Sequence, residues 1–197
     1  MKALDPIRVR QKTGQELFHR SGDAANRSLL DFWQWSGSDL LGNTARGILA
    51  EYIVAMDLGA ATGIWSGWDP YDIKTKDGTK VEVKSAAYIQ TWRQKSFSRI
   101  EFGIGPTEGW DPDSGERLKG KKRWSDVYVF CVLATKEADK VDPMDLDQWE
   151  FYVLPAATLD KEVPRQQRIA LSSLVRIGAI RADYGTIGVS IRSCLSR

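Results

Sequence analysis

Cysteine and histidine are nearly absent from this sequence. Its 197 residues contain two cysteines, Cys131 and Cys194, far apart and without metal-ligand spacing, and a single histidine, His19, which has no cysteine or histidine near it. Zinc sites use closely spaced cysteine and histidine ligands, so the sequence argues against a zinc site. The scarcity of cysteine also indicates a reducing compartment.

Long hydrophobic runs and a strong excess of charge are missing as well. No apolar run approaches the roughly 20 residues that span a bilayer, and the basic N-terminus lacks the apolar segment of a signal peptide. We therefore expect a cytoplasmic protein with no membrane contact. The net charge of +2 is too small to indicate nucleic-acid binding from bulk charge, so any basic binding surface must be local.

The length and composition are those of one ordinary globular domain. A chain of 197 residues, 42% of them hydrophobic, is long enough for one core and short for two. We expect a single domain over residues 1–197. Residues 1–22 are rich in basic side chains, and the tendency of termini to be poorly ordered favours an exposed, flexible arm over one that grips nucleic acid.

Periodicity indicates both helices and strands. Helical patterns cover residues 23–35, 43–59, 171–177 and 184–195, and strand patterns cover 100–104, 126–134 and 148–154. Residues 126–134 are apolar almost without interruption, which is typical of a strand buried on both faces. The order of these segments predicts an α/β fold with a mixed central β-sheet flanked by α-helices.

The segment 43–59 is the clearest helix, and its interior is apolar almost all round, which predicts burial. Glu51 lies in its middle, and no basic residue stands three or four positions away. Because burying an unpaired carboxylate is costly, Glu51 needs a partner from elsewhere in the fold. Solvent or an arginine would satisfy it, and so would a metal ion or a catalytic lysine.

A predicted β-hairpin follows, with Asp72 on its first strand, Glu82 and Lys84 on its second, and Asp77-Gly78 as its turn. Glu82 and Lys84 share one face of the second strand. A two-residue loop would place Asp72 and Glu82 on opposite faces. A three-residue loop over 76–78, with its glycine in the left-handed conformation, would pair them directly, so a shared site predicts the three-residue loop.

Two segments mix basic and aromatic residues. Residues 93–99 suit a phosphate contact or an exposed turn equally well. Residues 105–125 are predicted to be a long loop, and such loops tend to be functional or disordered; this one could reach over a groove. Trp92, Trp110 and Trp124 stand beside these basic residues, where they could stack on an unpaired base, although aromatic residues more often belong to the core. The candidate nucleic-acid contacts are Arg93, Lys95, Arg99, Lys119, Lys121, Lys122 and Arg123.

The chemistry of the hairpin residues suits a divalent metal. Carboxylates from neighbouring strands are hard oxygen ligands for Mg²⁺ or Mn²⁺, and the main-chain carbonyl of Val83 could supply a third oxygen. Lys84 could orient or deprotonate an attacking water, or stabilise charge in a transition state. Glu51 could complete the acidic cluster or help to bind a second metal.

Glu51 in a helix, Asp72 on one strand and Glu82-Val83-Lys84 on the next resemble the PD-(D/E)xK nuclease superfamily, which includes many type II restriction endonucleases. The resemblance covers about residues 43–134; Pro70 stands two positions before the aspartate instead of directly before it. Asp69 is a competing candidate, but on an extended strand it would face the other side from Asp72. The resemblance implies a restriction-endonuclease-like fold and metal-dependent hydrolysis of DNA phosphodiester bonds. It assigns catalysis to Glu51, Asp72, Glu82 and Lys84, and metal binding to Asp72, Glu82, Val83 and Glu51.

Two alternatives remain. A nonenzymatic DNA-binding or assembly module could keep the same fold, or Glu82 and Lys84 could form a solvated charge pair in an unrelated α/β protein, worth only a few tenths of a kcal/mol. A homodimer is expected only if the protein cuts both strands of a duplex.

Overall fold

A computed structural model of the chain describes residues 7–111 and 114–196. The chain divides into two compact units, one built from the residues up to Asp39 with Thr62–Trp65, and the other from Leu40–Ala61 with the residues from Ser66 onward. The prediction that the whole chain is one domain stays a prediction. Within the described ranges, no helix is long and apolar enough to cross a membrane.

The first unit contains a β-hairpin and one helix. Strands β1 (Leu17–Arg20) and β2 (Asp23–Ser28) pair antiparallel, and both residues of their turn, Ser21 and Gly22, have positive φ, as a tight two-residue hairpin turn requires. Helix α1 (Leu29–Gly37) begins with a capping box between Ser28 and Asp31. The helix predicted from residue 23 is therefore wrong over Asp23–Ser28, because these residues pair with β1, and the last residues of the predicted arm form β1 itself. Residues 1–6 of that arm lie outside the described residues.

The second unit is built on a mixed sheet with the strand order β11-β9-β8-β4-β3. Only β4 and β8 pair in parallel among these strands, and the remaining pairs are antiparallel. Every residue of β8 is buried, as its apolar sequence predicts for a central strand. The predicted α/β class with a mixed central sheet is confirmed. The strand bounds are β3 Ile73–Lys74, β4 Lys80–Ala87, β8 Val127–Leu133, β9 Trp149–Pro155 and β11 Ile180–Ala182.

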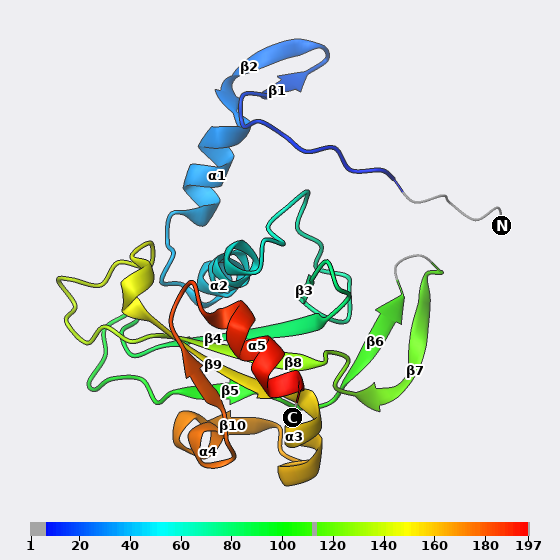
Figure 1. The fold of residues 1–197 in the computed structure, drawn as a ribbon. Coiled ribbons are helices and arrows are strands. Elements are labelled where there is room, and N and C mark those ends of the chain that lie inside the picture. Colours follow the sequence, from blue (N-terminus) through cyan, green and yellow to red (C-terminus); the bar gives the residue numbers. More distant parts are fainter. Residues whose placement is uncertain (1–6, 112–113, 197) are drawn as a thin grey trace. The chain divides into compact units, whose positions relative to one another are not determined.

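Both faces of this sheet are covered (Figure 1). Helices α2 (Asn43–Asp57) and α5 (Ile187–Leu195) pack on the face that presents Val81 and Val83. The other face packs against a small pair of strands, β5 and β10, and two short helices, α3 and α4. A 3₁₀ turn (Leu146–Gln148) precedes β9. The bounds of the second layer are β5 Glu101–Gly103, α3 Ala156–Glu162, β10 Arg168–Ala170 and α4 Leu171–Arg176.

Helix α2 is less buried than its composition predicts. It ends at Asp57, and its interior residues Ile48 and Tyr52 are exposed, so burial all round is wrong. The exposed apolar residues lie away from the sheet, because one helix can turn only one side toward it. Asp57 accepts hydrogen bonds from the main-chain N–H groups of Gly185 and Gly188, which ties the end of α2 to the start of α5.

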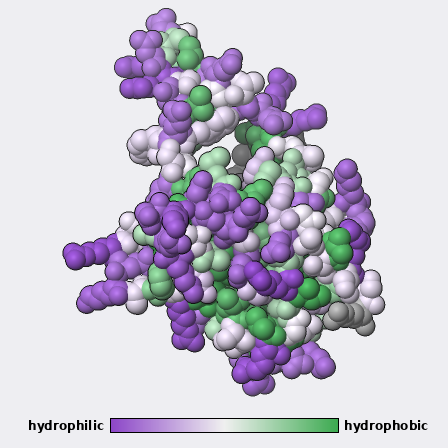
Figure 2. All heavy atoms as spheres, turned by 60° about the vertical axis from the view of Figure 1, so that its left-hand side comes forward, coloured by the Kyte–Doolittle hydropathy of each residue, from purple (hydrophilic) through white to green (hydrophobic). Residues whose placement is uncertain are grey.

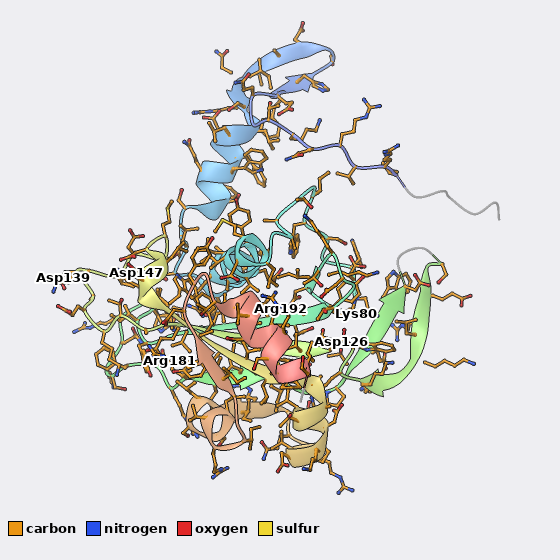
Figure 3. All side chains as sticks on the ribbon, viewed as in Figure 1. Lys80, Asp126, Asp139, Asp147, Arg181 and Arg192 are labelled. Carbon is orange, nitrogen blue, oxygen red and sulfur yellow. The ribbon has the colours of Figure 1, made fainter. Side chains whose placement is uncertain are left out.

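The starts of β4 and β8 are joined by two hydrogen bonds around Lys80 and Asp126, both labelled in Figure 3. The Asp126 carboxylate accepts from the Lys80 N–H at 2.8 Å, and the Asp126 N–H donates to the Lys80 carbonyl at 2.8 Å. These bonds hold the end of β4 that carries Glu82.

Within the predicted long loop over 105–125, residues 107–111 and 116–122 pair as two strands of a hairpin. Strands β6 (Thr107–Asp111) and β7 (Glu116–Lys122) pair antiparallel with an irregularity between Glu108 and Trp110. Gly109 faces the Trp124 ring so closely that an added Cβ would lie 2.6 Å from it. A glycine is therefore needed for Trp124 to pack against the hairpin, and glycine and proline content alone does not reveal such a tertiary contact.

Candidate active site

The turn between β3 and β4 has the length that a shared site of Asp72 and Glu82 predicts. Ile73 pairs with Val81 and Lys74 with Lys80, and Asp72 lies directly before this paired segment. Thr75 donates its N–H to the Thr79 carbonyl at 3.0 Å, and Gly78 has a φ of +91°. The predicted three-residue loop is confirmed.

Asp72 is held by the main chain of β4. Its N–H donates to the Val81 carbonyl at 3.1 Å, and its carboxylate Oδ2 accepts from the Val83 N–H at 2.7 Å. The carboxylate thus takes the place of a main-chain acceptor where the chain bends away from the sheet. The N–H and C=O of one strand residue point to the same side, so the Val83 carbonyl faces the Asp72 side too.

Both oxygens of Glu82 have side-chain partners. Lys84 Nζ lies 2.5 Å from Glu82 Oε1, and Ser125 Oγ donates to Glu82 Oε2 at 3.1 Å. Ser125 is only 5% exposed and lies two residues before the buried strand β8. Glu82 is therefore held from two sides in one orientation.

Burial and neighbouring charges change the acidity of this cluster. Burial raises the pKa of Asp72 to about 7, and the charges of Glu82 and Glu51 add to this, while the Val83 N–H and Lys84 oppose it. For Lys84, burial alone would lower the pKa, but the charge and hydrogen bond of Glu82, helped by Asp72 and Glu51, raise it above its usual value. Lys84 is therefore protonated near neutral pH. Burial, with the charge of Glu82, also raises the pKa of Tyr128, which stands opposite Glu82 on β8.

Glu51 reaches this cluster from α2. It is half-buried, and its charge raises the pKa of both Asp72 and Lys84. The catalytic role of Glu51 stays a prediction.

Asp72 and Glu82 open into a cleft of about 280 Å³. One wall is the segment that precedes β3, including Trp68 and the competing acid Asp69; the other is β6, with Thr107, Glu108 and Trp110. The predicted segment 105–125 does reach a groove, but as a hairpin. Asp69 lines the same cleft as Asp72, although only Asp72 bonds to the main chain of β4.

The donor set in the cleft is small. Within residues 7–111 and 114–196, no group of three or more histidine, cysteine, aspartate or glutamate residues is arranged to hold a metal ion. The predicted set of Asp72, Glu82 and the Val83 carbonyl has two side chains and one main-chain oxygen. This composition fits Mg²⁺, which binds through one or two carboxylates and keeps several water molecules.

The predicted nucleic-acid contacts divide into exposed residues and one buried exception. Arg123 has a side chain that is 1% exposed; its Nε donates to the Ile104 carbonyl at 2.8 Å, and its Nη atoms bond to Asp160 and to the Val163 carbonyl. A phosphate contact by Arg123 is therefore wrong, because its donors hold the fold together. Arg99 pairs with Glu101 at 3.2 Å. The side chains that remain exposed are Arg93, Lys95, Arg99, Lys119, Lys121 and Lys122.

Two features of the site were missed from the sequence. Ser125 was not singled out, although a hydroxyl directly before the predicted central strand 126–134 is a signal that its side chain lies beside the neighbouring strand. Trp68 was not considered either, since no basic residue stands next to it.

No curated protein matches the chain. A family does match: residues 2–168 correspond to the family of bacteriophage T4 endonuclease IV. The matched range includes Glu51, Asp72, Glu82 and Lys84 with both walls of the cleft, and it ends before α4, β11 and α5. The chain belongs to the bacteriophage T4 endonuclease IV family, a family of nucleases.

Proposed function

We propose that the protein is a divalent-metal-dependent endonuclease that hydrolyses DNA phosphodiester bonds at a PD-(D/E)xK-type site in a restriction-endonuclease-like fold. One observation carries the proposal: Asp72 and Glu82 line one open cleft, with Lys84 bonded to Glu82. Membership of an endonuclease family supports the nuclease activity and DNA as its substrate.

Asp72, Glu82 and the Val83 carbonyl would hold Mg²⁺ or Mn²⁺. The raised pKa of Asp72, caused by burial and by Glu82, supports this, because a bound cation would offset the cost of two carboxylates in one place. Such a metal binds a phosphate oxygen and lowers the pKa of a bound water.

Lys84 would act as a cation. Its raised pKa favours a protonated ammonium, which suits stabilisation of charge on the phosphate or orientation of the attacking water better than proton removal. The bond to Glu82 keeps the ammonium next to the predicted metal ligands. Glu51 would add negative charge that retains this protonated state and would help to hold a second ion.

The exposed lysines of β7 would contact the DNA backbone. Lys119, Lys121 and Lys122 lie on the hairpin that forms one wall of the cleft; Arg93, Lys95 and Arg99 would add contacts elsewhere. Replacing the three lysines by alanine should lower DNA affinity and flatten its dependence on salt, with the slope on duplex DNA falling by about 0.9 for each phosphate no longer neutralised. Replacing Arg123 instead should lower stability.

A cleavage assay tests the proposal. Purified protein is incubated with duplex, single-stranded and branched DNA, with Mg²⁺, with Mn²⁺ and with EDTA, beside the Lys84→Ala variant. We expect cleavage that requires the metal and Lys84. Cleavage in EDTA would contradict metal dependence, whereas DNA binding without cleavage under any of these conditions would favour the nonenzymatic module. Cleavage of both strands of a duplex would support a homodimer.

A further inference from the structure

We propose that Trp68 and Trp110 form a nucleobase-stacking subsite, which holds the base of a nucleotide next to the scissile phosphate. The proposal rests on the proposed function, because it takes the phosphate to be bound at Asp72 and Glu82. Trp68 lies on the wall before β3 and Trp110 lies on β6, and both line the cleft that contains the two acids.

Exposure alone does not distinguish Trp68 and Trp110 from other exposed hydrophobic side chains. Figure 2 shows hydrophobic residues scattered among hydrophilic ones over one face of the molecule, and single exposed apolar side chains are normal on protein surfaces. Trp68 is 72% exposed and Trp110 is 38% exposed, and both belong to the cleft of the predicted acids. Two large aromatic side chains beside a predicted phosphate site have the chemistry of a base-binding surface.

The hairpin turns one face toward the cleft. Glu108 and Trp110 line the cleft, and their partners across the hairpin are Lys121 and Arg117. Residues directly opposite on paired strands share a face, so Lys121 and Arg117 belong to the same face as Trp110. Arg117 bonds to Glu108 at 3.0 Å, which offsets the negative charge on this wall.

The opposite face of the hairpin is occupied. Gly109 packs against Trp124 and Leu118. The ring N–H of Trp124 donates to the Thr107 carbonyl at 2.9 Å, and its ring centre lies 4.2 Å from Lys122 Nζ. Trp124 therefore supports the hairpin from behind. Of the tryptophans that the sequence places beside basic residues, Trp110 is the one that lines the cleft.

The size of the cleft limits its occupant. About 280 Å³ lies near the lower end of the roughly 300–1,000 Å³ of small-ligand pockets, so the cleft holds one base with its sugar and not a duplex. An unpaired base can come from a single strand or can be flipped out of a duplex. The stacking chemistry is the same in both cases, because every base has a flat π-face.

The first test removes the ring and the base separately. The cleavage position is mapped with the wild-type protein, and substrates are made with an abasic residue on either side of that position. We expect Trp110→Leu to lower kcat/KM about ten-fold on the intact substrate, Trp110→Phe to retain most activity, and Trp110→Leu to cost nothing further on the substrate that lacks the stacked base. Equal losses on intact and abasic substrates for both Trp68→Leu and Trp110→Leu would overturn the subsite.

The second test does not depend on cleavage. In the Lys84→Ala background with Mg²⁺, a short oligonucleotide is titrated while tryptophan fluorescence is recorded, and Trp35→Leu, which removes an 84% exposed tryptophan outside the cleft lining, serves as the matched control. Affinity should fall about ten-fold in Trp110→Leu and not in the control. Unchanged affinity in both cleft variants would overturn the subsite, even if the wild type cleaves DNA.

Single-stranded and duplex forms of the same oligonucleotide distinguish the two possible sources of the stacked base. An effect confined to the single strand assigns the base to unpaired DNA. An equal effect on the duplex assigns it to a flipped base. Loss of wild-type cleavage with a retained effect of Trp110 on binding would contradict the proposed function but keep the subsite.

Discussion

Asp72 and Glu82 line the same cleft, but the protein holds them by different means. Asp72 is held by a main-chain N–H at 2.7 Å, with its pKa raised to about 7 mainly by burial. Glu82 is held by two side chains, a lysine at 2.5 Å and a buried serine at 3.1 Å. The charge of Glu82 is thus balanced within the protein, whereas that of Asp72 is balanced less well. In our proposal, this difference is what draws a cation into the cleft.

The largest effect is expected from Lys84→Ala, which removes the ammonium group that pairs with Glu82. We expect a loss of about 10²–10³-fold in the cleavage rate, measured by single-turnover kinetics at saturating metal. Lys74→Ala is the matched control, since Lys74 is an exposed lysine on the neighbouring strand β3. Retained activity in Lys84→Ala would remove Lys84 from the mechanism.

Asp72→Asn tests the acid that is held by the main chain of β4. The amide oxygen can still accept from the Val83 N–H, but the side chain no longer ionises and is a weaker metal ligand. We expect Mg²⁺ to stabilise the wild type against unfolding much more than the variant, as measured by the melting temperature with and without metal. An equal shift in both proteins would show that Asp72 does not bind the metal.

Without metal, the difference in stability between Asp72→Asn and the wild type should depend on pH. Because the pKa of Asp72 is raised by folding, the wild type binds the proton more tightly when folded and loses stability as the pH rises from about 4 through 7. Asp72→Asn does not titrate, so its stability relative to the wild type should rise over that window and stay constant above it. Denaturant unfolding from about pH 4 to about pH 8 measures this, and a constant difference between the two proteins would contradict the raised pKa.

A smaller effect is expected from Ser125→Ala, which removes one of the two partners of Glu82. A hydrogen bond to a charged group is worth about 1.5–3 kcal/mol, and Lys84 still holds the other oxygen. We expect metal affinity to fall about ten-fold by calorimetry, with Ser125→Thr restoring most of it. A loss of stability in Ser125→Ala without any change in metal affinity would make Ser125 a structural residue only.

The smallest effect is expected when the lysines of β7 are replaced one at a time. Lys121→Ala should lower DNA affinity only a few-fold at physiological salt and leave metal binding unchanged, since the variant neutralises only one phosphate fewer. DNA titrations at several salt concentrations measure this change. An effect of Lys121→Ala on metal affinity would show that the hairpin and the acids are coupled.

The sequence by itself determined the features that arise from local geometry. The turn at Gly78 and the alternation along β4 were enough to predict the three-residue loop and the register of β3 and β4, because a hairpin register is set within a few residues of its turn. The apolar run of β8 likewise predicted a central strand. These properties depend on neighbours in the chain.

Only the tertiary structure decided the features that depend on distant partners. Arg123 follows exposed lysines in one basic run, yet it is buried by bonds to Ile104, Asp160 and Val163. Residues 107–111 and 116–122 pair as a hairpin, with Gly109 packed against Trp124, and Ser125 meets Glu82 because β8 lies parallel to β4. Burial and long-range pairing select among conformations that local pattern leaves equally open, and they decided which basic residues face solvent and which side chains hold the acids.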